Sequence, residues 1–288
     1  MMSVGRCYLR RALSCSFAST PEAVMSEPGG QPGETRPPFL PEVQIEGPGP
    51  QRRWTVLVRL ILLIPHFIVL YAVGIAAAVV SVLGWFAALF TARLPPWIAD
   101  FLVLYVGYRT RVGAYLTLLV DSYPQFLTTA IGYPVRVDIR PGRLNRAAVF
   151  FRLILVIPAA VVAAVLAHGW AVLAFFLWLA VLIAGRTPRP VFGASAAFVR
   201  YDLRVQSYWS LLTDSYPKRL FGDGGSAEEG ARAQGTRPLT LSTGARVLLI
   251  AFIVLGVLGL LATGISSALH EPEPEYYQYH EYEIAPLV

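Results

Sequence analysis

The sequence predicts an all-α integral membrane protein made of two tandem modules. Each module is a transmembrane helical hairpin followed by an interfacial amphipathic helix, and one more transmembrane helix closes the chain. Three observations predict this. The 288 residues are 55% hydrophobic and 15% charged, with a mean hydropathy of +0.54, well outside soluble averages. Residues 41–124 and 134–217 align without a gap at an offset of 93, with 30 identities in 84 positions. Each copy holds an uninterrupted apolar stretch of 39 residues.

The first 40 residues are expected to be a disordered leader. They are rich in Ser, Pro, Gly and Glu, and they cannot bury enough apolar surface to become ordered. Met1 and Met25 both remain possible as the true start. Cys7 and Cys15 are the only cysteines and both lie in the leader, so a disulfide framework or a cysteine-based metal site in the rest of the chain is excluded.

A short alternating segment opens each module. It is VQIE at residues 43–46 in the first copy and VRVDI at residues 135–139 in the second, and a Pro-Gly pair follows each. Alternation followed by a turn signal predicts a brief strand, outside the membrane, in front of each hairpin.

Each apolar stretch is too long for a single crossing. One straight helix of 39 residues would reach about 58 Å, roughly twice the hydrocarbon core of about 30 Å. A polar His168 followed by Gly169 interrupts the second stretch, and Gly74 lies near the equivalent place in the first. We therefore expect two hairpins. Their four spans cover residues 54–73, 75–92, 147–167 and 170–185.

The hairpins bring the flanking arginines to one face of the membrane. The positive-inside rule makes that face cytoplasmic and places the N-terminus there. Arg59 and Arg152 lie six residues beyond Arg53 and Arg146, where long side chains reach back toward the head groups. The flanking set is Arg52, Arg53, Arg93, Arg143, Arg146, Arg186 and Arg189.

A third helix is predicted in each module, over residues 97–120 and 191–213. Its apolar and aromatic residues recur at spacings of three and four, while the other faces carry charges such as Arg111 and Arg204. Crossing the bilayer would bury such charges at about 2.5–3.5 kcal/mol each. We therefore expect both helices to lie in the cytoplasmic interface.

The phrase Asp-Ser-Tyr-Pro closes both of these helices. Its proline forces Tyr123 or Tyr216 out of helical geometry, which makes the phrase a predicted stop signal. A carboxylate is unfavourable at a helix C-terminus, so we expect Asp121 and Asp214 to pair with a cation. The candidate cations are Arg93 and Arg186, or Arg111 and Arg204. A structural role is favoured over catalysis or ion binding, because neither aspartate has a second acid, a histidine or a metal set beside it in the sequence.

The chain ends with a polar, Gly-rich linker over residues 218–244, a transmembrane helix over 245–265 and an acidic, Tyr-rich tail over 266–288. An odd number of spans puts the tail outside the cell, so the prediction is a multi-pass cell-membrane protein with a cytoplasmic N-terminus. The tail is interpreted as disordered rather than as a docking peptide. His270 and His280 leave loose metal binding open.

The order of phrases R-RLIL-IPH…W-A-LFT-R-P…R-AYL-LL-D-YP resembles the bacterial membrane family called domain of unknown function 4389. The resemblance covers two tandem copies, from Pro41 to Pro217. The first copy has IPH ending at His66 where the second has IPA ending at Ala159, so His66 does not fit a mechanism that needs both copies. The resemblance supports the fold and implies no activity.

The leading functional hypothesis is a non-enzymatic membrane scaffold or regulator that engages lipid or protein partners. Residues 52–218 hold 16 basic and 5 acidic residues, a net charge of +11, which favours anionic lipid at the cytoplasmic face. The alternative is a subunit of a small transporter or channel, with two parallel repeats around an axis along the membrane normal. Against it, the predicted spans hold no acidic residue. An oligomer is possible.

Enzymatic and nucleic-acid functions are not supported by the sequence. It holds no catalytic triad, P-loop or glycine-rich nucleotide turn, so no catalytic residue, cofactor or metal site is predicted. The arginines flank spans, which lipid explains better than nucleic acid does. The candidate interfacial or structural residues are Arg59, Arg152, Arg93, Arg186, Arg111, Arg204, Asp121, Asp214, Tyr123 and Tyr216.

Overall fold

The structure is a computed structural model that describes residues 40–127, 132–222, 236 and 239–269, all within one compact unit. The predicted leader, most of the linker and the tail from residue 270 lie outside the described residues. Among those described, the elements in chain order are β1 (Glu42–Ile45), α1 (Arg53–Thr91), α2 (Pro96–Leu116), β2 (Val135–Asp138), α3 (Arg146–Phe150), α4 (Arg152–Ala184), α5 (Arg189–Trp209) and α7 (Thr243–Leu269). A mostly helical chain with a short strand in front of each module is thus confirmed.

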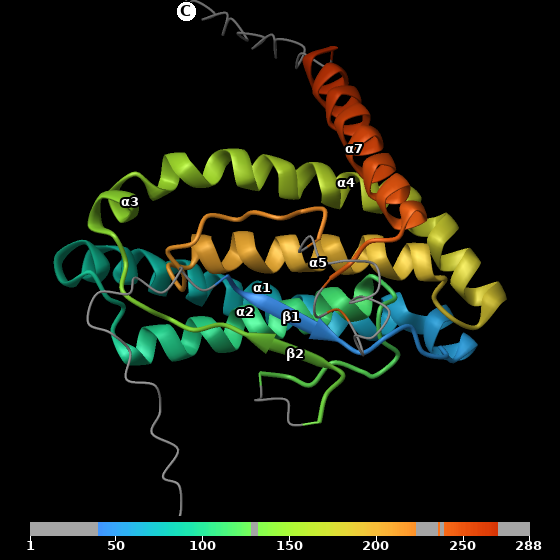
Figure 1. The fold of residues 1–288 in the computed structure, drawn as a ribbon, viewed down its shortest axis with the longest axis horizontal. Coiled ribbons are helices and arrows are strands. Elements are labelled where there is room, and N and C mark those ends of the chain that lie inside the picture. The colour runs from blue at the N-terminus through green and yellow to red at the C-terminus, as the bar shows by residue number, and fades with distance from the viewer. Residues whose placement is uncertain (1–39, 128–131, 223–235, 237–238, 270–288) are drawn as a thin grey trace, which may run out of the picture. The chain divides into compact units, whose positions relative to one another are not determined.

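The elements form three layers (Figure 1). Helices α2 and α5 contact each other and make the middle layer. The strands lie against one side of it, β1 on α5 and β2 on α2, and the long helices lie against the other, α1 on α2 and α4 on α5. Helix α7 packs on α4 and α5. Each strand therefore packs on the middle helix of the other module.

The two strands pair with each other, which the sequence did not predict. They run antiparallel, with Glu42 opposite Asp138 and Ile45 opposite Val135. At the offset of 93, Glu42 corresponds to Val135 and Ile45 to Asp138. Exchanging the two copies therefore converts the pair Glu42–Asp138 into the pair Val135–Ile45, which is also present in the sheet. A self-complementary contact of this kind is the mark of a two-fold relation, here a pseudo-two-fold relation between the two modules.

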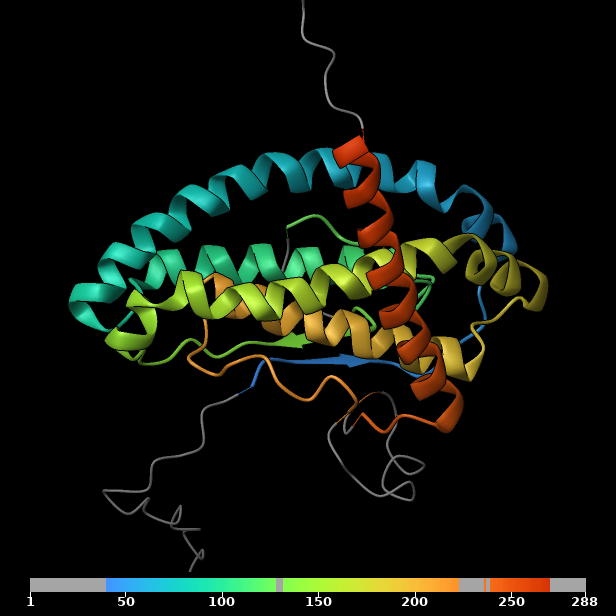
Figure 2. The same cartoon turned by 90° about the horizontal axis from the view of Figure 1, so that it is seen from above.

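The predicted hairpins are wrong, because each apolar stretch continues as helix. Helix α1 runs for 39 residues, and α4 runs for 33 residues after the short α3. Figure 2 shows α1 curved along its length, with α2 inside the curve. Pro65 and Pro158 lie inside the two helices, where a proline removes a backbone hydrogen bond and favours bending.

Gly74 and Gly169, which were predicted to mark the hairpin turns, lie within continuous helices and allow close packing against neighbouring helices. A Cβ on Gly169 would overlap the carbonyl oxygen of Phe252 on α7, and a Cβ on Gly256 would overlap that of Val165 on α4. A Cβ on Gly74 would lie 3.3 Å from the hydroxyl of Tyr105. Small residues let helix backbones approach closely, so these positions are glycine although the helix continues through them.

The middle helices end four residues earlier than predicted. The left-handed residues Leu118, with φ of 62°, and Leu211, with φ of 61°, close α2 and α5. The backbone N–H of Leu119 bonds to Ala114 at 3.1 Å, and that of Leu212 bonds to Ser207 at 3.0 Å. This closure satisfies terminal carbonyls before the proline is reached, so Asp-Ser-Tyr-Pro is not the stop signal.

Three arginines on the charged faces of α2 and α5 are buried and not exposed as predicted, whereas Asp100 is exposed and Arg109 is partly exposed. Arg111 is 7% exposed, Arg200 and Arg204 are 1% exposed. Arg204 donates to the carbonyl of Pro41 at 3.2 Å and to that of Lys218 at 2.7 Å. The polar faces are thus covered by the segments around the sheet, a packing that periodicity alone does not reveal.

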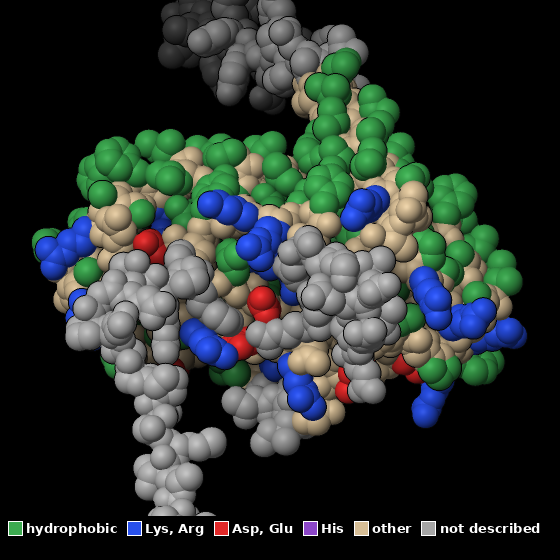
Figure 3. Space-filling view, in the orientation of Figure 1, with side chains coloured by type: hydrophobic (Ala, Val, Ile, Leu, Met, Phe, Trp, Pro, Cys, Tyr) green, Lys and Arg blue, Asp and Glu red, His purple; other side chains and the backbone are tan. Residues whose placement is uncertain are grey.

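An apolar surface covers the side opposite the sheet. With few exceptions, the exposed large hydrophobic side chains lie on α1, α4 and α7, and Figure 3 shows them above and the charged side chains below. Within the described residues, these are also the three helices long and apolar enough to cross a membrane, over Arg53–Thr91, Arg152–Ala184 and Thr243–Ser267. We refer to this set of side chains as the apolar surface.

Candidate functional site

The first arginine cluster joins the start of α1 to the end of α2. Its members are Arg59, Tyr115, Asp121 and Tyr123. The guanidinium of Arg59, 2% exposed, donates to the carbonyl of Tyr115 at 2.6 Å and to the Gln51 side chain at 2.9 Å. It lies 4.3 Å from the centre of the Tyr115 ring and 3.5 Å from the Asp121 carboxylate. A cation therefore satisfies a carbonyl at the C-terminal end of α2, where the helix dipole favours positive charge.

The second arginine cluster repeats this arrangement in the other module. Its members are Arg152, Tyr208, Asp214 and Tyr216. Arg152 donates to the carbonyl of Tyr208 at 2.8 Å, lies 4.3 Å from the centre of that ring and lies 3.5 Å from Asp214. A third bond, of 3.1 Å, goes to the carbonyl of Thr213. The snorkelling predicted for Arg59 and Arg152 is wrong, since both guanidiniums are held inside the protein.

The two aspartates also meet the start of their own module's helices. Asp121 accepts from the backbone N–H of Arg52 at 3.3 Å and from the hydroxyl of Thr55. Asp214 accepts from the backbone N–H of Asn145 at 3.4 Å. A carboxylate is favourable at a helix N-terminus. The predicted pairing with a cation is correct, but the partners are Arg59 and Arg152 instead of the candidates from the sequence.

The tyrosines of the Asp-Ser-Tyr-Pro phrases pack edge-on against the rings that carry the arginines. The centre of Tyr123 lies 6.1 Å from that of Tyr115, and the centre of Tyr216 lies 5.7 Å from that of Tyr208. Sequence reasoning missed Tyr115 and Tyr208 as members of these clusters. Both are retained at the offset of 93, so identity between the copies was the signal that could have found them.

Arginines gather where the end of one long helix meets the start of the other. The first basic junction consists of Arg52, Arg53, Arg186 and Arg189, and the second consists of Arg93, Arg143 and Arg146, all of them exposed. The backbone N–H of Gln51 bonds to Gly185 at 2.9 Å at the first junction. The N–H of Leu144 bonds to Ala92 at 2.9 Å at the second. Each junction therefore combines a C-terminal end from one module with an N-terminal end from the other.

An ion pair joins the modules through equivalent positions. Arg109 of α2 lies 3.4 Å from Asp202 of α5, and these residues correspond at the offset of 93. The pair therefore lies near the pseudo-two-fold axis. The carboxylate holds the pKa of Arg109 above its usual value. The pair lines a cavity of about 190 Å³ that also touches Phe67 of α1 and Ala167 of α4.

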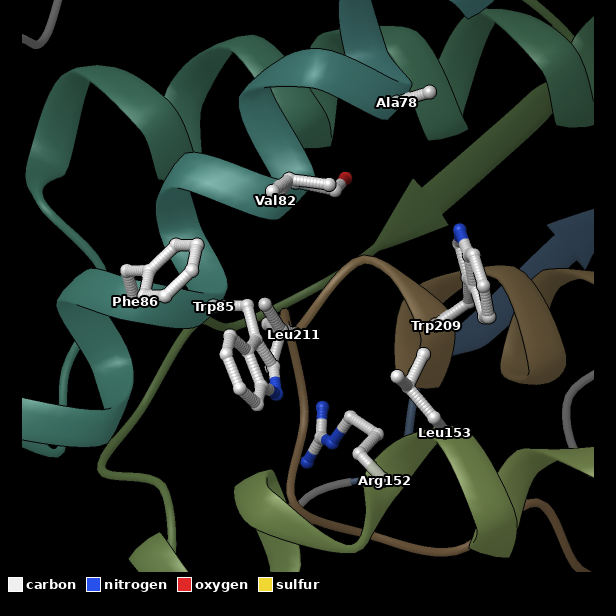
Figure 4. Close-up of a pocket in the computed structure, with 9 residues that line it drawn as sticks. Ala78, Val82, Trp85, Phe86, Arg152, Leu153, Trp209 and Leu211 are labelled. Carbon is white, nitrogen blue, oxygen red and sulfur yellow. The ribbon is translucent and has the colours of Figure 1, made fainter.

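A larger cavity of about 340 Å³ lies between α1 and the start of α4. Figure 4 shows the side chains of α1 on one side, with Arg152, Leu153 and Trp209 across from them. The lining is almost wholly apolar. It consists of Ala78, Ser81, Val82, Trp85, Phe86, Arg152, Leu153, Trp209 and Leu211.

A buried histidine distinguishes the first module. The Nδ1 atom of His66 lies 2.6 Å from the hydroxyl of Tyr108, and the imidazole stacks on Phe126 with ring centres 4.3 Å apart. Burial raises the pKa of Tyr108 to about 12, so this hydroxyl keeps its proton, and the tautomer of His66 sets which of the two groups donates. In the second module the equivalent Tyr201 hydroxyl reaches the carbonyl of Ala159 at 3.5 Å. The contact is structural and specific to one copy.

The described sites consist of buried charged clusters, exposed apolar and basic surfaces, and two cavities. Within the residues that the structure describes, no three His, Cys, Asp or Glu side chains are grouped so that they could hold a metal ion. In each arginine cluster, the guanidinium donates to a carbonyl at a helix C-terminal end and pairs with the aspartate of the same cluster. The features that face outward are the apolar surface, the basic junctions and the larger cavity.

Fold and site together define a mostly helical protein built from two copies of one module, with three helices among the described residues that are long and apolar enough to cross a membrane. The family described as a domain of unknown function, DUF4389, matches residues 53–128 and again residues 146–220. The chain belongs to this family, and the prediction of two tandem copies is confirmed. No curated protein and no solved structure matches the chain.

Proposed function

We propose that the protein is a non-enzymatic scaffold of the cell membrane in which α1 and α4 lie as arches in the cytoplasmic leaflet. Only α7 crosses the bilayer, and the sheet faces the cytoplasm, where it is available to protein partners. The single observation that carries this proposal is the placement of the apolar surface opposite the sheet, with a basic junction at each end of the long helices.

The length of the long helices supports the arch. The 39 residues of α1 make about 58 Å of helix measured along its curved axis, whereas the hydrocarbon core is about 30 Å thick. A helix that lies along the membrane surface meets no such limit, and amphipathic helices bury an apolar face in this way. Figure 2 shows both ends of α1 bending toward the middle layer. Arg53 begins α1 and Arg93 follows its end, and both are exposed, so the arch is expected to bring both to the head groups on one side.

The sheet argues against a crossing by α1 and α4. If α1 crossed the bilayer, α2 and the sheet alongside it would enter the hydrocarbon too. The outer edge of β1 is bonded to Thr236, whose hydroxyl accepts from the N–H of Ile45 at 2.9 Å and donates to the carbonyl of Val43 at 3.0 Å. The exposed side chains of Arg136 and Arg140 lie on or beside β2, and burying such a charge at the bilayer centre costs about 2.5–3.5 kcal/mol.

The basic junctions supply the charge that the proposal needs. Arg111 on α2 and Arg200 and Arg204 on α5 are buried, whereas the arginines of both junctions are exposed. An exposed arginine at the surface of an anionic leaflet contributes about 1 kcal/mol to membrane binding. The positive-inside rule then makes this leaflet cytoplasmic and puts the end of α7 on the far side.

Cysteine accessibility in intact cells tests the arrangement. In a background with Cys7→Ser and Cys15→Ser, single cysteines replace Arg52, Arg93, Ala76 and Ser267. An impermeant thiol reagent added outside is expected to label only position 267, and positions 52 and 93 are expected to react only after permeabilisation. Ala76, exposed at the middle of α1, is expected to resist labelling in both conditions because it lies in hydrocarbon.

Each competing topology gives its own pattern in this assay. Labelling of position 76 from outside would support a hairpin with its turn at the outer face. Labelling of positions 52 and 93 from opposite sides would mean that α1 crosses the bilayer. Either pattern would overturn the arches, and loss of all signal at position 267 would overturn the crossing by α7.

The ion pair near the pseudo-axis favours one second candidate, a subunit of a small transporter. Arg109 and Asp202 line a cavity shared by both modules, and repeat interfaces are where transporters bind their substrates. Purified protein in liposomes would then raise solute or ion flux above that of empty vesicles. Asp202→Asn would lower the flux if the pair takes part, whereas flux equal to that of empty vesicles would remove this candidate.

A further inference from the structure

We propose that the cavity between α1 and α4 holds one acyl chain of an anionic phospholipid, whose head group binds at the second basic junction. This inference rests on the proposed function, because the chain enters the cavity from the leaflet in which α1 and α4 lie. It assigns a specific lipid site to one end of the molecule, in addition to general contact with the bilayer.

The cavity has the chemistry of an acyl-chain site. Its volume of about 340 Å³ lies in the range of small-ligand pockets, roughly 300–1,000 Å³. Val82, Phe86 and Leu153 belong both to its lining and to the apolar surface, so the cavity is continuous with the surface that contacts lipid. An apolar cavity open to the membrane selects a hydrocarbon chain over a polar solute.

The head group is assigned to the second basic junction for two reasons. Arg152, the charged residue in the lining, is 2% exposed, and its two terminal nitrogens donate to the carbonyls of Tyr208 and Thr213, so it does not reach a head group at the membrane surface. Arg93 follows Phe86 by seven residues, the last two beyond the end of α1, so the two residues are at most about 15 Å apart, no more than the roughly 15 Å of hydrocarbon in one leaflet. The acyl chain of a phospholipid whose phosphate binds Arg93 is therefore long enough to reach the cavity.

The junction and the cavity are fixed to each other. The indole of Trp85 lines the cavity and donates to the carbonyl of Val149 at 2.9 Å, inside α3, which begins with Arg146. Arg143 and Arg146 therefore keep their positions relative to the cavity wall. Three exposed cations at one place match the negative charge of a phosphatidylglycerol-type head group.

The second module provides a natural variant of the cavity wall. At the offset of 93, Val82 corresponds to Phe175, whose ring stacks near Trp178 with centres 6.1 Å apart. The second copy carries Phe175 as an exposed side chain, so the fold tolerates phenylalanine at this position. Because Val82 lines the cavity, the larger side chain of Val82→Phe is expected to take up part of its volume. Leu83→Phe is the matched control, since Leu83 is 52% exposed and does not line the cavity.

Native mass spectrometry of the full chain in mild detergent tests the site. The wild-type protein is incubated with phosphatidylglycerol or phosphatidylcholine, and the fraction that retains one lipid is measured. Val82→Phe is expected to lower phosphatidylglycerol occupancy by on the order of tenfold, the equivalent of withdrawing about two methylene groups from an apolar site. Leu83→Phe is expected to match the wild type. The triple variant Arg93→Gln, Arg143→Gln, Arg146→Gln is expected to bind both lipids equally weakly.

Two results would overturn the site. If Val82→Phe and Leu83→Phe retain lipid equally, the cavity does not hold the chain. If the triple variant keeps the wild-type preference for phosphatidylglycerol, the head group binds elsewhere. Because this assay is done in detergent, its failure is distinguishable from failure of the membrane arrangement, which the cysteine labelling measures.

Discussion

The indole N–H of Trp85 donates a hydrogen bond of 2.9 Å to the carbonyl of Val149. Its equivalent in the other copy, Trp178, donates one of 2.8 Å to the carbonyl of Val56. Val56 and Val149 correspond at the same offset of 93, so each module contributes one donor and one acceptor to a reciprocal pair. The two copies are therefore joined as a symmetric dimer is, within a single chain.

The reciprocal indoles are expected to contribute equally to stability. Trp85→Phe and Trp178→Phe each remove one hydrogen bond while keeping an aromatic ring. Each is expected to cost about 1 kcal/mol, and the double variant about the sum. Thermal unfolding in detergent, followed by circular dichroism, measures this. Trp97→Phe, at a position 61% exposed, is the control and should leave the midpoint unchanged. Strongly unequal costs for the two variants would contradict the symmetry.

Replacing either buried arginine, Arg59 or Arg152, by lysine is expected to lower the stability of the protein. Arg59→Lys keeps the charge but cannot reach the carbonyl of Tyr115 and the side chain of Gln51 while it stacks on the ring. A loss of about 2 kcal/mol is expected from the unpaired groups that remain. Arg152→Lys should behave alike, whereas Arg93→Lys at the exposed junction should stay within about 0.5 kcal/mol. The measurement is the unfolding midpoint, and tolerance of lysine at both buried sites would contradict the clusters.

The crossing of α4 and α7 is expected to require glycine. In Gly169→Ala the added Cβ would overlap the carbonyl of Phe252, so the helices must separate. A cost of about 2 kcal/mol or more is expected, as for an overpacked core. The control is Gly107→Ala in α2, where a Cβ would meet nothing within 4 Å and helix propensity would improve by about 1 kcal/mol. A disulfide between cysteines placed on α4 and α7 would report the separation directly. Equal cross-linking in the two variants would contradict the contact.

The ion pair between Arg109 and Asp202 is expected to stabilise the protein equally when the two residues are exchanged. Arg109→Asp places two carboxylates together and should cost about 1 kcal/mol, because the pair is partly exposed. The exchange Arg109→Asp with Asp202→Arg should restore stability, since the two positions are equivalent. A double-mutant cycle of unfolding midpoints tests this. No recovery in the exchanged variant would mean that the two environments differ more than the symmetry allows.

Several features of the fold could be predicted because they are local or repeated. The apolar composition predicted helices suited to a membrane, and the offset of 93 predicted two copies of one module. The same offset made Arg59 and Arg152, and Asp121 and Asp214, equivalent candidates, and the structure places them in matching clusters. Alternation in VQIE and VRVDI predicted the strands to within a residue.

The sequence by itself determined which residues are apolar, which positions correspond and where helix begins. Only the tertiary structure decided that the long helices continue through Gly74 and Gly169, that Asp121 meets Arg59, and that the two strands pair with each other. Hydropathy and periodicity depend on each residue and its near neighbours. The course of an apolar helix and the partner of a buried charge depend instead on which distant segment covers them. In this protein that segment often belongs to the other module, as Trp85 on Val149 demonstrates.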